Sequence, residues 1–276
     1  MNAPGSLTYV YAVSHRTGPL GDALVGLHGI GQAPLRLLPL TADTELAPST
    51  SLAFVASDVP EQDFNETALK NHFEDLDWLE YVARTHHDVV QAVAARATVL
   101  PLRMATVYQD DHRARQALAA QQDVFSQRLD QLRAHTEYGV KIYLTPEVTQ
   151  PPAAAPAPAT SPGKAYLQAR RAQRHSRDAV YQQAEQAAET IETIASRHAT
   201  QRVRHAPQRG ELTGPQENVV NDAYLIPDDQ AGPFQAAIAA AAQHFPDLRI
   251  EVTGPWAPYS FAMPAADSTD APEPPP

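Results

Sequence analysis

The chain has 276 residues, a formal net charge of −11 and no cysteine. The lack of cysteine excludes disulfides, thiolate zinc sites and cysteine nucleophiles, and it fits a reducing, cytoplasmic setting. The acidic balance argues against general affinity for nucleic acid, and no apolar run approaches the roughly 20 residues of a membrane span.

The first sixty residues predict a β-rich opening. Residues 7–13 are rich in β-branched and aromatic side chains, which favours a strand. Residues 35–40 and 51–57 are two further strand candidates. The glycine cluster GLHGIGQ at residues 26–32 does not match the GxGxxG spacing of a nucleotide-binding turn, so we interpret it as a glycine-rich turn.

The stretch at residues 78–108 predicts a long amphipathic helix followed by a strand. Asp75 or Asp77 can cap the helix start. The β-branched run at 98–100 then favours a strand. Pro101 has no N–H, so we expect that strand at a sheet edge, a bend or a bulge. The helix has one apolar stripe at gaps of three and four residues: Leu79, Ala83, His86, Val90 and Val93.

A second helix and a strand follow. Asp110 and Asp111 suit the positive end of a helix, whose apolar stripe continues to Leu132. Residues 138–144 alternate between apolar and polar side chains, as a half-buried strand does. The order of elements predicts a ferredoxin-like mixed sheet with helices over residues 1–145.

The second half of the chain predicts a linker, another domain and a tail. Residues 146–162 are rich in proline and alanine, which favours an extended linker at a domain boundary. A long helix over residues 163–198 leads a C-terminal α+β domain, which we expect to cover residues 163–261. The acidic, proline-rich residues 262–276 predict a disordered tail. The expected fold class is therefore α+β with two domains.

The long helix carries the main candidate for a binding surface. Its N-terminal half contains Arg170, Arg171, Arg174 and Arg177, of which Arg170, Arg174 and Arg177 share one face. One interpretation is a solvated face, alone or paired with the acidic N-terminal domain. The other is a docking surface for an acidic partner or for another copy of this protein.

Arg103 is a second, weaker candidate. It could bind a carboxylate or phosphate of a partner. It could equally form an internal ion pair with Asp110, Asp111 or Glu137, since arginine is well suited to such pairs.

No pattern indicates catalysis, a cofactor or a metal. His86 and His87 are adjacent and point about 100° apart on a helix, so they do not form a chelating pair, and we expect packed or hydrogen-bonded histidines. The chain shows no acid–base dyad, nucleophile triad or phosphate loop. We expect four aromatic residues in the C-terminal domain to be core residues: Tyr224, Trp256, Tyr259 and Phe261. The alternative is a hydrophobic contact for a partner.

Six blocks in order resemble the gas vesicle GvpF/GvpL family of accessory proteins. They are YVYAV, ARTHHDVV with VLPLRMATVY, EYGVKIYL, GKAYLQARR, NDAYLI and GPWAPYSF, and they span residues 9–261. GPWAPYSF is the most distinctive, and its two prolines lead us to expect an irregular docked segment. One departure is Met104-Ala105, where the family pattern leads us to expect Phe-Gly; an alanine there argues against a need for positive φ.

The resemblance implies a non-enzymatic accessory role in gas vesicle assembly, in the cytoplasm and associated with gas vesicles. The implied partners are the small, hydrophobic main shell protein and other accessory proteins, which this chain would hold in a chaperone-like manner. The alternative is a minor structural component of the vesicle wall.

Overall fold

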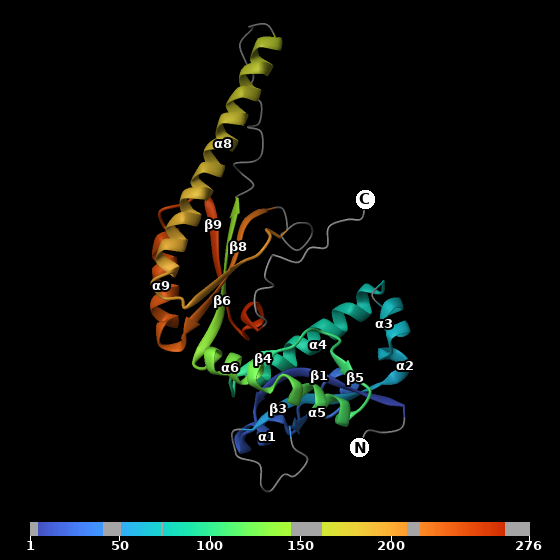
Figure 1. Ribbon diagram of the computed structural model, residues 1–276. Helices are drawn as coiled ribbons and strands as arrows, with labels where there is room; N and C mark the ends of the chain where they lie inside the picture. Colours follow the sequence, from blue (N-terminus) through green and yellow to red (C-terminus); the bar gives the residue numbers. More distant parts are fainter. Residues whose placement is uncertain (1–4, 41–50, 73, 145–161, 209–215, 263–276) are drawn as a thin grey trace, which may run out of the picture. The chain divides into compact units, whose positions relative to one another are not determined.

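The computed structural model describes residues 5–40, 51–72, 74–144, 162–208 and 216–262 (Figure 1). The chain divides into two units. The first unit consists of two segments, one that ends at Ala134 and one that begins at Trp256. The second unit covers His135–Pro255. Both units combine helices with a β-sheet, so the α+β fold class predicted from the sequence is confirmed.

The first unit has the strand order β2-β3-β1-β4, and β5 also pairs with β1. A β-α-β-β-α-β succession with this order is a ferredoxin-like sheet. Its pairings are all antiparallel, where the sequence suggested a mixed sheet. The elements are β1 (Ser6–His15), α1 (Gly18–Leu24), η1 (Ile30–Gln32), β2 (Arg36–Pro39), β3 (Leu52–Pro60), α2 (Glu61–Phe64), α3 (Glu66–His72), α4 (Leu76–Ala94), β4 (Val99–Pro101), β5 (Val107–Tyr108), α5 (Asp111–Ala120), α6 (Gln122–Leu132) and η4 (Tyr259–Phe261).

The central strand β1 is buried on both faces. Its residues from Tyr9 to Val13 have no exposed surface. On one face, Tyr9 and Tyr11 pack with the apolar stripe of α4. On the other, Phe54 of the neighbouring β3 contacts Phe125 of α6. A strand covered on both faces needs a continuous apolar run, which is the pattern that residues 7–13 show.

Side-chain caps start the two predicted helices. The carboxylate of Asp75 accepts from the backbone N–H groups of Asp77 and Trp78, both at 3.1 Å, so Asp75 is the cap of α4. Asp110 accepts from the N–H of Arg113 at 2.7 Å and caps α5. The apolar stripe that follows suggested one helix to Leu132, but the backbone breaks at Gln121 and leaves two helices, α5 and α6.

The chain after α4 forms a short strand, a turn and a second short strand. Ala105, in the turn between β4 and β5, has φ of +61°. The expectation that an alanine here avoids positive φ was therefore wrong. The N–H of Ala105 donates to the hydroxyl of Tyr9 at 2.9 Å, so tertiary contact with β1 holds this conformation.

The second unit repeats the ferredoxin-like order. Its sheet runs β7-β8-β6-β9, and β8 pairs antiparallel with both β6 and β7. Its elements are β6 (His135–Leu144), α8 (Pro162–Ala195), β7 (Gln201–Arg204), β8 (Glu217–Pro227), η3 (Asp228–Gln230), α9 (Ala231–Ala242) and β9 (Leu248–Trp256). The C-terminal half of α8 and α9 pack on one face of this sheet, with Ile191, Phe234 and Ile238 in the core.

The two units do not follow the boundary expected from the sequence. The strand at residues 138–144 was assigned to a domain of residues 1–145, but β6 pairs with β8 from His135 to Leu144 and belongs to the second unit. The segment from Trp256 was assigned to the C-terminal domain and belongs to the first unit. Strand partners are chosen by long-range hydrogen bonds, which chain order does not reveal. The expected linker and tail lie almost wholly outside the described residues.

Candidate partner-binding site

The N-terminal half of α8 extends past the end of its own sheet (Figure 1). Every described side chain from Arg170 to Ala179 is exposed, and burial begins only at Val180. None of these described side chains is packed against the sheet, whereas the half of α8 that follows is packed in the core. We call residues 170–177 the basic arm, since they hold four exposed arginines: Arg170, Arg171, Arg174 and Arg177.

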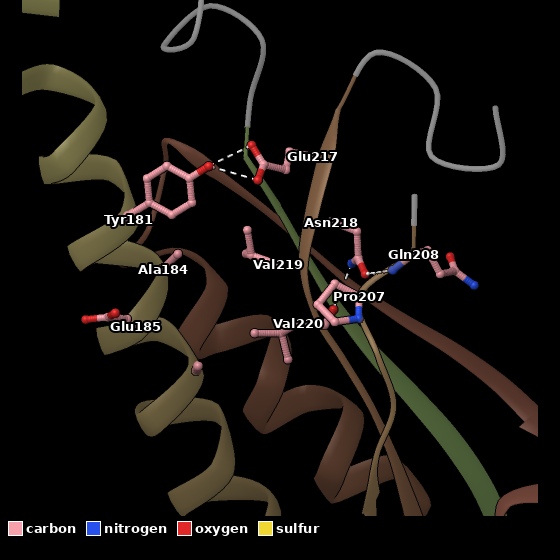
Figure 2. Close-up of a pocket in the computed structure, with 10 residues that line it drawn as sticks. Tyr181, Ala184, Glu185, Pro207, Gln208, Glu217, Asn218, Val219 and Val220 are labelled. Atoms are coloured by element: carbon pink, nitrogen blue, oxygen red, sulfur yellow. Dashed lines mark hydrogen bonds between the residues drawn. The ribbon is translucent and has the colours of Figure 1, made fainter. Parts of the chain in front are cut away.

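A groove of about 610 Å³ begins where the basic arm ends. It lies between α8 and the N-terminal half of β8, as Figure 2 shows. Apolar side chains from both elements make much of its lining: Ala184, Ala188, Val219 and Val220, with Pro207 from the segment after β7. The small side chains of Ala184 and Ala188 leave space between α8 and the sheet.

Tyr181 joins the basic arm to the groove. Its hydroxyl lies 2.8 Å from both carboxylate oxygens of Glu217 on β8. The guanidinium of Arg177 lies 3.4 Å from the same hydroxyl and 5.6 Å from the centre of the ring. The hydrogen bond to Tyr181 raises the pKa of Arg177 further above its already high value.

Polar contacts fix the opposite wall of the groove. The side-chain oxygen of Asn218 accepts from the N–H of Gln208 at 2.8 Å. Its amide nitrogen donates to the carbonyl oxygens of Ile142 and Val220, at 3.1 and 2.8 Å. Asn218 is buried, so these three bonds satisfy a group that would otherwise be costly to bury, and they hold residues 207–208 beside β8.

The basic arm and the groove together suit an amphipathic ligand. The groove offers apolar surface for the apolar side of a bound segment, and the arm offers guanidinium groups that pair well with carboxylates. The sequence indicated the arm but not the groove. The groove is formed by three segments that are distant in the chain, and only strand pairing brings them together.

Arg103, the other candidate, is exposed and forms no ion pair among the described residues. None of the three described residues suggested as its internal partners, Asp110, Asp111 and Glu137, forms an ion pair with it. Asp111 pairs instead with Arg36, at 2.6 Å, and its other contact is the hydroxyl of Thr8. The hydrogen bonds from Arg36 and Thr8 hold the pKa of Asp111 below its usual value despite the opposing effect of burial. Arg103 belongs to the first unit and the basic arm to the second.

The two adjacent histidines have different surroundings. His86 is buried and hydrogen-bonded, as expected for a packed histidine. His87 lies between the rings of Trp256 and Tyr259, with centroid distances of 5.6 and 5.9 Å. Among the described residues, no three His, Cys, Asp or Glu side chains are grouped closely enough to hold a metal ion.

The four aromatic residues expected in the core divide into two pairs. Tyr224 and Phe261 are buried, as predicted. Trp256 and Tyr259 are 38% and 36% exposed, so the prediction was wrong for them. The irregular segment was also predicted to start too early, because β9 continues to Trp256. The N–H of Ala257 then donates to the side-chain oxygen of Gln91 on α4, at 2.5 Å, which docks the segment.

None of the helices in the described ranges combines the length and apolarity that crossing a bilayer requires.

Comparison with known proteins identifies the relatives of this chain. The family model of the gas vesicle synthesis protein GvpL/GvpF matches residues 7–263. Gas vesicle protein L of Streptomyces sp. (strain CB03234) is 39% identical over 260 residues, covering 93% of this chain and 92% of that protein. Gas vesicle protein F of the same strain is 27% identical over 263 residues, covering 92% and 98%.

A solved structure shares the fold. The crystal structure of gas vesicle protein GvpF from Anabaena sp. PCC7120 aligns with a TM-score of 0.64 at 17% identity, covering 94% of this chain and 97% of that one. At this identity the match shows the fold alone.

Proposed function

The chain belongs to the GvpL/GvpF family of gas vesicle synthesis proteins and has a role in gas vesicle formation, and on this premise we propose that it is a non-enzymatic accessory protein that holds the main shell protein before assembly. The observation that carries the proposal is the family match over residues 7–263. The proposed setting is the cytoplasm, beside growing vesicles, and other accessory proteins are the proposed further partners.

The groove of the second unit is the proposed docking site. The main shell protein of gas vesicles is expected to be small and hydrophobic, so an accessory protein must cover its apolar surface to prevent aggregation. The groove supplies an apolar lining from Ala184, Ala188 and Val220. The basic arm beside it, with Arg170 and Arg174 exposed, would pair with carboxylates of the bound segment.

Electrostatics would set the rate of this encounter more than its strength. Exposed arginines steer an acidic partner over distances comparable to the Debye length, about 10 Å at 0.1 M salt. Apolar contact in the groove would then slow dissociation. We therefore expect the affinity for the shell protein to fall as salt is added, mainly because association becomes slower.

The alternative is a minor structural part of the vesicle wall. It is favoured if the chain remains on washed vesicles in a fixed ratio to the shell protein. An accessory factor is instead expected to leave the vesicles during washing.

Co-expression with the main shell protein tests the proposal. We expect the shell protein to stay in the supernatant after sedimentation and to co-purify with a tagged form of this chain. If the shell protein aggregates to the same extent with and without this chain, the proposal is wrong.

Charge reversal on the basic arm locates the site. The double variant Arg170→Glu/Arg174→Glu leaves the contacts of Tyr181 in place and should reduce recovery of the shell protein severalfold. Arg113→Glu/Arg197→Glu is the matched control, because both residues are exposed and the change in net charge is the same. Equal recovery with the two double variants would remove the basic arm from the site.

A further inference from the structure

Strand β9 differs from the other strands that end the two sheets. β2, β4 and β7 have four, three and four residues, whereas β9 has nine, of which the six from Leu248 to Thr253 precede Gly254 and Pro255. It lies at the end of the order β7-β8-β6-β9, so within the described part of the chain its sheet neighbour is β6. Short edge strands limit unwanted pairing, and a long edge strand offers backbone groups to another strand.

The two faces of β9 are chemically distinct. Ile250 and Val252 are partly buried and pack against the core beneath α8 and α9. Arg249 and Glu251 alternate with them on the other face, where a guanidinium nitrogen of Arg249 lies 3.4 Å from a carboxylate oxygen of Glu251. The guanidinium also lies 4.3 Å from the centre of the Tyr143 ring on β6. No proline interrupts the strand between Leu248 and Thr253.

We propose that β9 pairs with β9 of a second copy of this chain, antiparallel and centred on Ile250. In that register Arg249 of each copy lies opposite Glu251 of the other, and Leu248 lies opposite Val252. Opposite charges that face each other across strands are stabilising, and like charges are destabilising. The pairing is self-complementary, so one twofold axis closes the dimer and no further copy can add at the same edge.

A groove on the apolar face fits this arrangement. It has a volume of about 370 Å³ and lies between α9 and β9, lined by Ile238, Ala239 and Ala242 on the helix and Ile250 and Val252 on the strand. Apolar side chains of the second copy project to the same face of the joined sheet as Ile250. They would contact this groove while the charged pairs form on the opposite face.

Analytical ultracentrifugation of the full chain across the micromolar range tests the dimer. We expect the wild-type chain to change from monomer to dimer as its concentration rises. Glu251→Arg places arginine opposite arginine in both halves of the pairing, so we expect a loss of affinity of about tenfold or more. Glu189→Arg, an equal charge change at an exposed position of α8, is the control and should dimerise as the wild type does.

A mixture of two single variants checks the register. Arg249→Glu puts glutamate opposite glutamate and should weaken the dimer to a similar extent. An equimolar mixture of Arg249→Glu and Glu251→Arg restores every opposite pair, so we expect a heterodimer, and circular dichroism confirms that each variant is folded. A wild-type chain that stays monomeric, a Glu251→Arg chain that dimerises as tightly as the wild type, or a mixture that dimerises no more tightly than either variant alone would each overturn the proposal.

Discussion

The hydroxyl of Tyr9 lies 3.0 Å from Nδ1 of His86, and this contact joins strand β1 to helix α4 across 77 residues of chain. The same hydroxyl accepts a hydrogen bond from the N–H of Ala105. Nε2 of His86 lies 3.1 Å from the carbonyl oxygen of Leu102, which can only accept, so the proton of a neutral ring is on Nε2. Nδ1 then accepts from the hydroxyl of Tyr9, and the network is complete with a neutral His86.

Removing the hydroxyl of Tyr9 should therefore destabilise the first unit. Tyr9→Phe leaves Nδ1 of His86 and the N–H of Ala105 without this partner, and unsatisfied buried groups cost about 1–3 kcal/mol. Urea unfolding measures the loss. Tyr81→Phe is the control, because the hydroxyl of Tyr81 accepts from the N–H of Gly31 at the surface. A loss no larger than the control's would show that the buried network contributes little.

The stability of the first unit should fall in mild acid. Burial is the largest cause that lowers the pKa of His86, to about 4, from 6.5 in the unfolded chain. The unfolded state therefore takes up a proton first as pH falls, so the contribution is present above pH 6.5 and is lost between pH 6.5 and 4. The shift corresponds to about 3 kcal/mol when complete.

His86→Gln tests the origin of that pH dependence. Glutamine can donate and accept hydrogen bonds but does not titrate. We expect the variant to be less stable at pH 7 and to lose less of its remaining stability between pH 7 and pH 5, measured by urea unfolding at each pH. The same acid dependence in the variant and the wild type would assign the effect to other groups.

Gly29 is required by its contact with Tyr11. A Cβ added at Gly29 would lie 2.1 Å from the hydroxyl of Tyr11, which is held by hydrogen bonds to Ile30 and Ser57. Gly29→Ala must displace this buried ring, and overpacking typically costs about 1–3 kcal/mol. Gly232→Ala in helix α9 meets no atom within 4 Å and should be neutral or slightly stabilising. Thermal unfolding of both variants compares them directly.

Asp222 should be the most sensitive carboxylate of the second unit. Its side chain is 3% exposed, lies 2.6 Å from Nη2 of Arg202 and accepts from the hydroxyl of Tyr224 at 3.3 Å. Asp222→Ala removes this ion pair and leaves the hydroxyl of Tyr224 without its acceptor, while Arg202 keeps its ion pair with Glu192, so we expect a loss of about 1–3 kcal/mol. Glu66→Ala removes an exposed pair with Lys70 and should change stability by less than about 1 kcal/mol. Equal effects of the two variants in urea unfolding would contradict this.

Local features of the chain were predictable because their causes lie within a few residues. The caps at Asp75 and Asp110 follow from side chains that reach their own backbone, and the buried stripe of α4 follows from its period. The glycine cluster was interpreted as a turn, but the role of Gly29 was not predictable. That role depends on Tyr11, which lies on strand β1, and helix α1 separates the two residues in the chain.

The candidate site was predictable only in part. The spacing of Arg170 and Arg174 predicts that they share one helix face. In the structure both residues are exposed on α8. The groove beside them needs β8 to lie next to α8, and that depends on the pairing of β8 with β6. For Arg103 and Asp111 the sequence offered a plausible pair, but Arg36 is closer to Asp111 because β2 and α5 lie together.

The sequence alone determined the two long helices α4 and α8, the strands of the first sixty residues and of residues 138–144, the α+β class and, through ordered motifs, the resemblance to the GvpF/GvpL family. These depend on periodicity, local capping and residue order, which are properties of neighbouring residues. Tertiary structure decided that β6 belongs to the second unit, that Trp256 returns to the first, and that Ala105 takes positive φ. Each of these depends on hydrogen bonds or packing between residues distant in the chain, whose combined free energy outweighs local preference.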